Sequence, residues 1–391
     1  MRPGRYGQPL RVLHVTPYFP PTWAYGGIPR VVHGLARAQR RAGLDVRVWT
    51  TDAFDASRRA VVPARRTLDG LDVHVARNAS NRLAWEHQLF LPLGGPPLDD
   101  VQVVHLHAHR HLLNYTAWRE ATRRGIPVVH TPNGTAVAIE RKIRVKSVWD
   151  RLFDGDVPRR ADRVIATSRA EVRQLLGVGV PAERVVRIPN GLWLEEFTEL
   201  PARGAFRARH GLGDGPLIAY LGQITPRKGV DHLIAAFGAA RGGRLPGDAR
   251  LVVAGAVRGM DVPAGPGVFL PGTLEGSERL ALLVDADVLV YASSAEVFGL
   301  VPWEGLMCGA PVVVGGDCGC GELIAEAGAG LLVTHGDRDA LVGAVATLLS
   351  DRGAAGAMVD RGRRYAAHHL DQARIAAQHA DVYAEVVGGR G

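Results

Sequence analysis

No apolar run in the chain approaches the roughly 20 residues needed to cross a bilayer. Cysteine is also scarce: Cys308, Cys318 and Cys320 cannot build a disulfide framework, which fits a reducing compartment. The stretch from Met1 to Leu10 is polar and contains no apolar signal segment. Together these absences predict a cytoplasmic protein.

Lysine is rare among the basic residues. Only three of the 47 Lys and Arg residues are lysines, and the 39 acidic residues leave a formal net charge of +8. A pI near 9.8 favours anionic partners such as nucleotides, sugar phosphates or acidic membrane surfaces. We expect no nucleic acid among them, because no recognised nucleic-acid motif accompanies the charge.

The apolar residues are arranged as alternating strands and helices. At about 100–200 residues per domain, the length predicts two or three domains, and 47% hydrophobic residues exclude wholesale disorder. Strand-length apolar runs recur with helical stretches such as Ile28–Ala42 and Ser168–Leu176 between them, which predicts an α/β fold with doubly wound parallel sheets. The runs of the first half are Leu10–Val15, Val46–Thr50, Val101–Leu106, Val128–His130, Arg163–Ala166 and Arg184–Ile188. Those of the second half are Leu217–Leu221, Leu251–Ala254, Val288–Tyr291, Pro311–Val314 and Gly330–Val333.

The alternation of strands and helices is interrupted between Asn190 and Pro216, where proline, glycine and charged residues dominate. We place a linker there. The predicted domains are residues 1–195 and 196–370, followed by a C-terminal helix in residues 371–391 for which a return to the first domain stays open. Two such domains facing each other across a cleft suit a two-substrate reaction, because ligands of these sheets bind at the carboxyl ends of the strands.

The segment after the run Val288–Tyr291 carries the strongest local signal. Glu296 and Glu304 stand eight positions apart, with Gly299 and Pro302 between them. We expect Glu296 in a strand-to-helix loop and Pro302 at the start of a helix, which puts Glu304 in the first helical turn. Carboxylates accept from sugar hydroxyls, and the free N–H groups near the helix start suit a phosphate. Without other motifs, two ordinary surface glutamates would be the preferred interpretation.

Several segments, taken in order, resemble the family 4 glycosyltransferases of the GT-B fold. Glu296-x7-Glu304, followed by Met307-Cys308-Gly309-Ala310-Pro311-Val312-Val313, looks like the nucleotide-sugar signature of that family. The other segments are Pro20–Thr50 with Gly26 and Gly27, Ile188-Pro189-Asn190-Gly191, the loop Gly222-Gln223-Ile224-Thr225-Pro226-Arg227-Lys228-Gly229, and Gly319-Cys320-Gly321-Glu322-Leu323-Ile324. The similarity covers nearly the whole chain. It implies two Rossmann-like domains, with acceptor bound by the first and nucleotide sugar by the second.

The resemblance also implies roles for individual residues. Glu296 would hold hydroxyls of the donor sugar, Glu304 the ribose hydroxyls, and Lys228 the diphosphate leaving group, with Arg227 as its basic neighbour. Backbone at Phe298, Gly299 and Leu300 would meet the sugar and the diphosphate, and Gly26 and Gly27 would let the first domain approach the diphosphate. Fixed cations and N–H groups aimed at a leaving oxygen are a natural catalyst for this bond cleavage.

Two positions depart from the family pattern. Gln223 stands where an arginine is common, so leaving-group stabilisation rests more heavily on Lys228. Asn133, in His130-Thr131-Pro132-Asn133-Gly134, stands where a histidine is common and cannot carry a proton. Either His130 or His107 takes part on the acceptor side, or the departing phosphate takes the acceptor's proton and no protein base is needed.

We predict neither a metal site nor a cofactor. Asp154-Gly155-Asp156, Asp285-Ala286-Asp287 and Asp337-Arg338-Asp339 have DxD spacing but are interpreted as turns or helix ends. The three cysteines lack zinc-ligand spacing and are expected to be buried thiols. The histidines at 105, 107, 109 and 111 are interpreted as part of a loop at the edge of the cleft rather than a metal site.

The segment Arg141–Phe153 combines a helical apolar stripe with flanking basic residues. It either rests on an anionic membrane, which would place the protein peripherally at the inner membrane face, or packs on the core with a solvated basic side.

The leading hypothesis is a retaining, metal-independent glycosyltransferase that moves a sugar from a nucleoside-diphosphate sugar to an acceptor hydroxyl on a glycan, a lipid-linked sugar or a small molecule. The alternatives are a nucleotide-sugar-binding protein with little catalysis, suggested by Gln223 and Asn133, and a sugar-nucleotide epimerase of the GT-B fold.

Overall fold

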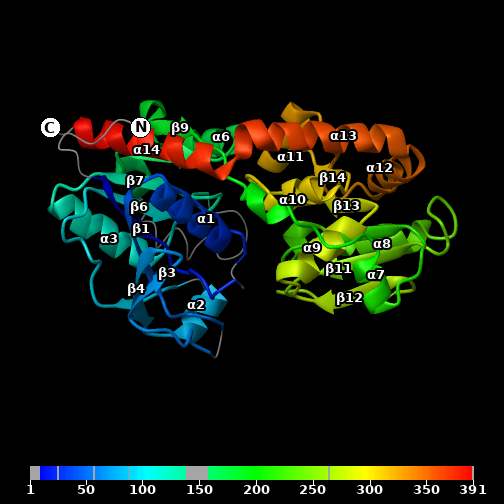
Figure 1. Cartoon of the computed structure of the whole chain (residues 1–391), viewed down its shortest axis with the longest axis horizontal. Coiled ribbons are helices and arrows are strands. Elements are labelled where there is room, and N and C mark those ends of the chain that lie inside the picture. The colour runs from blue at the N-terminus through cyan, green and yellow to red at the C-terminus, as the bar shows by residue number, and fades with distance from the viewer. Residues whose placement is uncertain are drawn as a thin grey trace. The chain divides into compact units, whose positions relative to one another are not determined.

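The computed structural model describes residues 9–23, 26–55, 58–87, 89–137, 157–262 and 265–389. The chain divides into two compact units (Figure 1). The first is Met1–Gly191 together with Gln372–Gly391, and the second is Leu192–Asp371. The basic segment Arg141–Phe153 lies outside the described residues.

The first unit is built on a nine-stranded, mostly parallel sheet. Its strand order is β3-β4-β2-β1-β6-β7-β8-β9, with β5 paired to β4, and only the β3–β4 and β4–β5 pairs are antiparallel. The central strands β6 and β7 are buried along their whole length because parallel strands are covered on both faces. The strands are β1 (Arg11–Val15), β2 (Asp45–Thr51), β3 (Arg65–Leu68), β4 (Leu71–Asn78), β5 (Pro92–Leu93), β6 (Val103–His107), β7 (Val128–Thr131), β8 (Arg163–Ala166) and β9 (Val185–Arg187).

Helices flank this sheet, and the last helix of the chain is one of them. α14 (Gln372–Gly388), red in Figure 1, packs against α1 (Ile28–Arg41). Tyr383 of α14 is fully buried, so the C-terminal helix contributes to the core of the first unit. The remaining helices are α2 (Asn81–His87), α3 (Leu112–Arg123), α5 (Val157–Arg160) and α6 (Arg169–Gly177), with a 3-10 turn at Ala182–Arg184.

The second unit contains a six-stranded, all-parallel sheet in the order β12-β11-β10-β13-β14-β15. The strands are β10 (Leu217–Leu221), β11 (Arg250–Ala254), β12 (Val268–Gly272), β13 (Val288–Tyr291), β14 (Val312–Gly315) and β15 (Gly330–Val333). The helices are α7 (Ala205–His210), α8 (Val230–Ala240), α9 (Gly276–Asp285), α10 (Leu300–Cys308), α11 (Gly319–Ala327), α12 (Arg338–Ser350) and α13 (Arg352–Tyr365). Shorter turns are η3 (Leu194–Phe197), η4 (Pro226–Lys228) and the π-type η5 (Ala366–Leu370).

The doubly wound architecture predicted from the apolar runs is confirmed, but the predicted linker over Asn190–Pro216 is wrong for most of its length. Phe206, in α7, is fully buried in the core of the second unit, and Phe197 and Leu212 pack into the same core. Strands β3, β4, β5 and β12 had no counterpart among the predicted runs. They lie toward the sheet edges. β4 mixes buried with exposed positions, and β3 and β12 have only partly buried and exposed ones, so a search for continuous apolar runs misses them.

The chain passes between the units twice, and the two crossings are neighbours. In the second unit, the Leu192 amide donates to the Leu370 carbonyl over 2.6 Å, and Leu192 bridges to Asp371 in parallel fashion. In the first unit, a Cβ on Gly191 would lie 2.4 Å from Oε1 of Gln372. The second unit is therefore an insertion whose two ends lie side by side.

Among the helices in the described part of the chain, none is both long and apolar enough to cross a membrane.

Candidate active site

Lys228, Glu296 and Tyr291 form one cluster in the second unit. Lys228 ends η4, Tyr291 ends β13, and Glu296 lies in the loop before α10. Lys228 Nζ forms an ion pair with Glu296 and donates to Tyr291 Oη over 2.7 Å, while the Tyr291 hydroxyl donates to Glu296 Oε2 over 2.9 Å. The predicted catalytic pair is thus brought together, with a tyrosine that sequence reasoning missed.

Burial and charge fix the protonation of this cluster. Lys228 is 7% exposed. Burial alone would raise the pKa of the Glu296 carboxyl, but Lys228, Arg227 and the Tyr291 hydroxyl outweigh it and hold that pKa below its usual value. Burial and the Glu296 charge raise the pKa of Tyr291 well above its ordinary value. At neutral pH the Glu296 carboxyl is therefore ionised and the Tyr291 phenol is neutral.

The loop that carries Glu296 is anchored on both sides. The Ser294 amide donates to the Arg227 carbonyl over 3.2 Å, and the Cys320 amide donates to the Glu296 carbonyl over 3.1 Å. Gly299 adopts φ +74° at the N-cap of α10, and a Cβ there would lie 2.6 Å from Cys320 Sγ. Only glycine fits this turn without strain, and no side chain caps α10, so N–H groups of its first turn remain for an anion.

Phe298 and Leu300 flank this glycine, and the helix start differs slightly from the prediction. Phe298 is buried, and Leu300 rather than Pro302 is the first residue of α10. Glu304 therefore lies in the second helical turn instead of the first. Glu304 is 4% exposed, and its side chain accepts a bond from Arg279 Nη1 over 2.5 Å.

The loop after β10 contains the predicted phosphate-loop residues. The hydroxyl of Tyr220 donates to the Gln223 carbonyl over 2.6 Å, and Arg227 Nη1 donates to the Ala295 carbonyl over 3.5 Å. A Cβ on Gly255 would fall 1.7 Å from the carbonyl oxygen of Gly222. The chain ends of β10 and β11 thus approach each other more closely than side chains would allow.

The residues that the sequence assigned to the first domain lie in the first unit: Gly26 and Gly27 for the diphosphate, and Asn133, His107 and His130 for the acceptor. Gly26 adopts φ +102°, and Gly27 is the N-cap of α1. His107 ends β6, and it is only 1% exposed. The prediction of a loop at a cleft edge is therefore wrong for His105 and His107, which belong to a buried strand; His109 and His111 lie beyond that strand but are buried as well.

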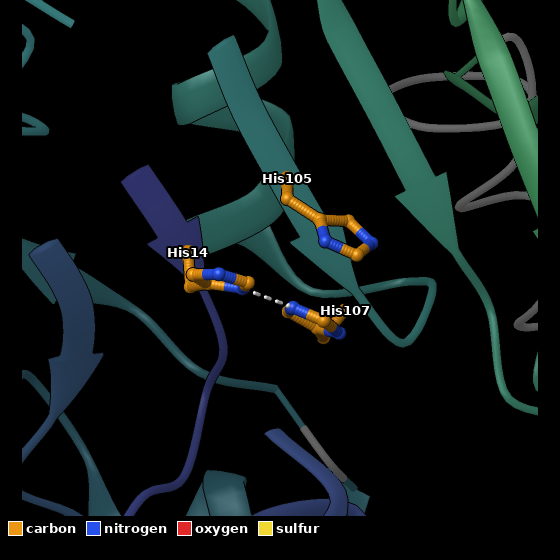
Figure 2. A group of neighbouring side chains, drawn as sticks. All are labelled: His14, His105 and His107. Carbon is orange, nitrogen blue, oxygen red and sulfur yellow. Dashed lines mark hydrogen bonds between the residues drawn. The ribbon is translucent and has the colours of Figure 1, made fainter. Parts of the chain in front are cut away.

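His14, His105 and His107 lie close together in the interior of the first unit (Figure 2). Together with Gln39 and Tyr383 they form a buried hydrogen-bonded network, which we call the histidine network. His107 Nε2 lies 2.8 Å from His14 Nδ1, and His14 Nε2 lies 2.7 Å from Gln39 Oε1. Gln39 donates to the Tyr383 hydroxyl over 3.0 Å, which lies 2.7 Å from His105 Nδ1. Because the Gln39 amide oxygen can only accept, His14 carries its proton on Nε2 and accepts from His107.

The electrostatics of the histidine network follow from burial. Burial lowers the pKa of His14 to about 4, although the hydrogen bond that His14 donates to Gln39 acts to raise it. Burial also lowers the pKa values of His105 and His107 well below 6.5. Nitrogen atoms of the three rings lie within 4.8 Å of one another. Two nitrogen ligands of a tetrahedral ion would lie roughly 3.3 Å apart. Nδ1 of His14 and Nε2 of His107 lie 2.8 Å apart, which is a hydrogen-bond distance. The geometry is that of a neutral hydrogen-bonded network.

Backbone strain gathers where β6 and β7 end. Ala108, Arg110 and Asn133 all have positive φ, between 52° and 63°, which side chains rarely adopt. His130 Nε2 lies 2.7 Å from the Ala108 carbonyl, and burial lowers the pKa of His130 to about 4. Asn133 Oδ1 accepts from Asn190 over 3.2 Å. Strain at an otherwise well-bonded strand end is a signature of functional loops.

Buried Glu171 holds the loop of Asn133 in place, and the sequence pattern gave no sign of this role. Its carboxylate accepts from the Gly134 amide over 2.5 Å and from the amide and hydroxyl of Thr167, both over 2.7 Å. Among the described residues, Nδ1 of His107 and of His130 have no partner, which leaves two buried nitrogens at these strand ends.

The remaining discounted motifs have structural roles. Asp285 caps α7 by accepting from the Gly204 and Arg207 amides, Asp287 pairs with Arg203 and Arg207, and Asp337 caps α12. Residues 154–156 lie outside the described residues. The expectation of buried thiols is confirmed, since Cys308, Cys318 and Cys320 are free and buried.

Comparison with known proteins identifies the family. Residues 25–196 match the model described as Glycosyltransferase Family 4, and residues 203–365 match the model described as Glycosyl transferases group 1. A D-inositol 3-phosphate glycosyltransferase of Xylanimonas cellulosilytica is 30% identical over 438 aligned positions, with 99% of both chains covered. A GDP-mannose-dependent alpha-mannosyltransferase of Mycobacterium tuberculosis is 29% identical, with 83% of this chain and 85% of that protein covered.

Solved structures share the fold. Sucrose-phosphate synthase from Thermosynechococcus elongatus matches with a TM-score of 0.75 at 21% identity, covering 97% of this chain and 100% of that one. An Anabaena protein solved in complex with UDP-glucose matches with a TM-score of 0.73 at 17% identity, covering 96% and 100%. With both halves matched by family models and a relative aligned along its whole length, the chain belongs to the family 4 glycosyltransferases of the GT-B fold.

Proposed function

We propose that this glycosyltransferase moves a sugar from a nucleoside-diphosphate sugar to an acceptor hydroxyl, with retention of the anomeric configuration and without a metal ion. The observation that carries the proposal is the buried Lys228–Glu296–Tyr291 cluster beside the uncapped start of α10. It combines a fixed cation, an oriented carboxylate and backbone N–H groups, which are the groups that a departing diphosphate and a sugar need.

The leaving diphosphate is the first half of the chemistry. Cleavage of the bond between sugar and phosphate builds negative charge on the leaving oxygen. Lys228 stabilises that charge, supported by Arg227 and by the N–H groups at Gly299 and Leu300. Gln223 supplies a hydrogen bond but no charge, so removal of the Lys228 ammonium has a large effect.

The carboxylates bind hydroxyls. Glu296 accepts from hydroxyls of the transferred sugar and stays ionised because Lys228 and Tyr291 outweigh its burial. Glu304 accepts from the ribose hydroxyls. The backbone at Phe298 lies between the two carboxylates in sequence and lines the sugar and diphosphate.

The acceptor side is assigned to the strand ends of β6 and β7 in the first unit. Asn133, held by Asn190 and by the loop bonded to Glu171, positions hydroxyls. His107 and His130 are neutral, and each has an Nδ1 without a partner among the described residues. A retaining transfer lets the departing phosphate take the acceptor's proton, so these histidines orient rather than ionise.

The test begins with thermal-shift screening against UDP, GDP and ADP and their sugars, followed by release of nucleoside diphosphate with and without acceptor sugars. Lys228→Met and Glu296→Gln should bind nucleotide yet lose turnover by roughly a hundredfold or more. Arg244→Met is the matched control, because Arg244 is an exposed cation of the same unit that pairs with exposed Asp339. Normal turnover by a folded Glu296→Gln protein would remove Glu296 from the mechanism. Loss of turnover on addition of EDTA would contradict metal independence.

A second candidate is a nucleotide-sugar-binding protein with little catalysis, which the uncharged Gln223 and the proton-inert Asn133 favour. Calorimetry with the donor panel followed by a hydrolysis assay separates the two. Tight binding with neither hydrolysis nor transfer would support this second function.

A further inference from the structure

Arg279 is a buried cation placed between two carboxylates of the second unit. It lies in the first turn of α9, and its side chain is 9% exposed. Nη1 donates to Glu304 Oε2 over 2.5 Å, and Nη2 donates to Glu196 Oε2, in η3, over 3.2 Å. The Glu304 side chain is buried more deeply, at 5% exposed, whereas 40% of the Glu196 side chain is exposed. The guanidinium on α9 therefore binds one carboxylate from α10 and one from η3.

This arrangement explains how Glu304 can be an ionised acceptor in a buried place. A buried carboxylate without a cation takes up a proton, and a second carboxylate nearby strengthens that tendency. Arg279 reduces both difficulties, since its charge offsets that of Glu304, lies between Glu304 and Glu196, and fixes one oxygen of Glu304. A residue that only filled space at this position would do neither.

The pair also matches the chemistry of a hydroxyl group. A ribose hydroxyl donates one hydrogen bond and accepts others. Glu304 accepts, and Arg279 has five N–H donors, of which the two bonds above use two. A 2′-hydroxyl that reaches this pair leaves water and satisfies donor and acceptor together. A 2′-deoxyribose at the same place would leave Glu304 and Arg279 without the hydroxyl as their hydrogen-bond partner. Buried charged groups that lose a partner make a site discriminate strongly against the ligand that lacks it.

We propose that Arg279 is the positioning residue for Glu304 and that the Arg279–Glu304 pair makes the donor site select ribonucleotides over 2′-deoxyribonucleotides. The inference rests on the proposed function, because it takes Glu304 as the ribose-binding carboxylate.

Calorimetry of the full chain with UDP, GDP and ADP and with their 2′-deoxy forms tests it. We expect the wild type to bind the ribose form of its preferred nucleotide about ten- to a hundredfold more tightly than the deoxy form. Arg279→Met should weaken binding of the ribose form and reduce the ratio to about threefold or less. Because its Glu304 lacks the Arg279 charge, this variant should bind the ribose form more tightly as pH rises from 5.5 to 8, whereas the wild type should change little.

Two further variants separate positioning from simple damage to the fold. Arg279→Lys keeps the charge but loses the planar fork, so it should keep the flat pH profile with a reduced ratio. It also serves if Arg279→Met does not fold. Arg363→Met is the matched control: Arg363 donates to the carbonyls of Leu306 and Met307 at the other end of α10, so its loss should lower stability and leave the ratio unchanged.

The outcomes are distinct. An equal ratio in the wild type and in both Arg279 variants, or a wild type that binds ribose and deoxy forms alike, would overturn the inference and leave the proposed function standing. Failure of the wild type to bind any nucleoside diphosphate would overturn both.

Discussion

Acid should unfold the first unit because its buried histidines are neutral. Burial lowers the pKa values of His14, His130 and His379 from 6.5 to about 4, against hydrogen bonds that raise them. In the unfolded chain they titrate near 6.5. Between pH 6.5 and 4 the unfolded chain therefore binds more protons than the folded one, and stability is lost as the pH falls through that window.

The size of the loss follows from the same three shifts. Each group with a shift from 6.5 to about 4 withdraws about 2 kcal/mol from the free energy of unfolding at pH 5 and about 3 kcal/mol well below pH 4. Three groups give about 6 kcal/mol at pH 5, which is comparable to the 5–15 kcal/mol that holds a typical domain together. His105, His107 and His109 shift in the same direction and add to the loss.

The pH dependence of the free energy of unfolding can be measured by urea unfolding of the full chain, monitored by circular dichroism at a series of pH values from 8 to 4.5. The transition of the first unit should move to lower urea concentrations below pH 6.5, and unfolding near pH 5 should take up at least about two to three protons per molecule. His379→Met removes one titrating group and should lower that uptake by about one proton while leaving the pH 8 behaviour comparable. A free energy of unfolding that stays constant from pH 8 to pH 5 would refute the reasoning, because it would require these imidazoles to be hydrated or paired with an acid.

Three further predictions concern the second unit and its cluster. Tyr291→Phe deletes the hydroxyl that joins Lys228 and Glu296, so stability should fall by about 1–3 kcal/mol and turnover should fall while nucleotide affinity changes little; unchanged kinetics would show that the hydroxyl only fills space. Gly299→Ala places a Cβ against Cys320 at a positive φ and should cost roughly 1 kcal/mol or more in the free energy of unfolding, with weaker diphosphate binding by calorimetry; a fully stable variant would contradict the strained turn. Glu296→Gln strands the buried Lys228 ammonium, so its melting temperature should drop unless a nucleoside diphosphate is present, and equal melting temperatures of variant and wild type would contradict the ion pair.

The sequence predicted the alternating strands for a definite physical reason. Central parallel strands such as β13 are covered on both faces and read as uninterrupted apolar runs. Strand β12 is not, because its positions are partly exposed. Lys228 and Glu296 were singled out by the resemblance of their segments to the family, because spacing alone favoured ordinary surface residues.

What the sequence could not reveal are contacts between distant segments. Arg279 stands 25 positions from Glu304 and 83 from Glu196, and nothing in its neighbourhood marks it as a partner of either. Glu171 appears as an ordinary first-turn glutamate of α6, yet it holds the loop of Asn133. Such pairings depend on how strands and helices are assembled, which spacing along the chain does not encode.

The side-by-side crossings at Gly191/Leu192 and Asp371/Gln372 make the second unit a cassette. Because the two junctions lie side by side, the inserted segment can be replaced by one of a different length without changing the distance that the two junctions span in the first unit. Recombination with a relative at those two junctions would transfer the whole second unit, to which we assign the nucleotide sugar, while keeping the histidine network and α14 of the recipient. Donor and acceptor preferences could thereby be inherited separately.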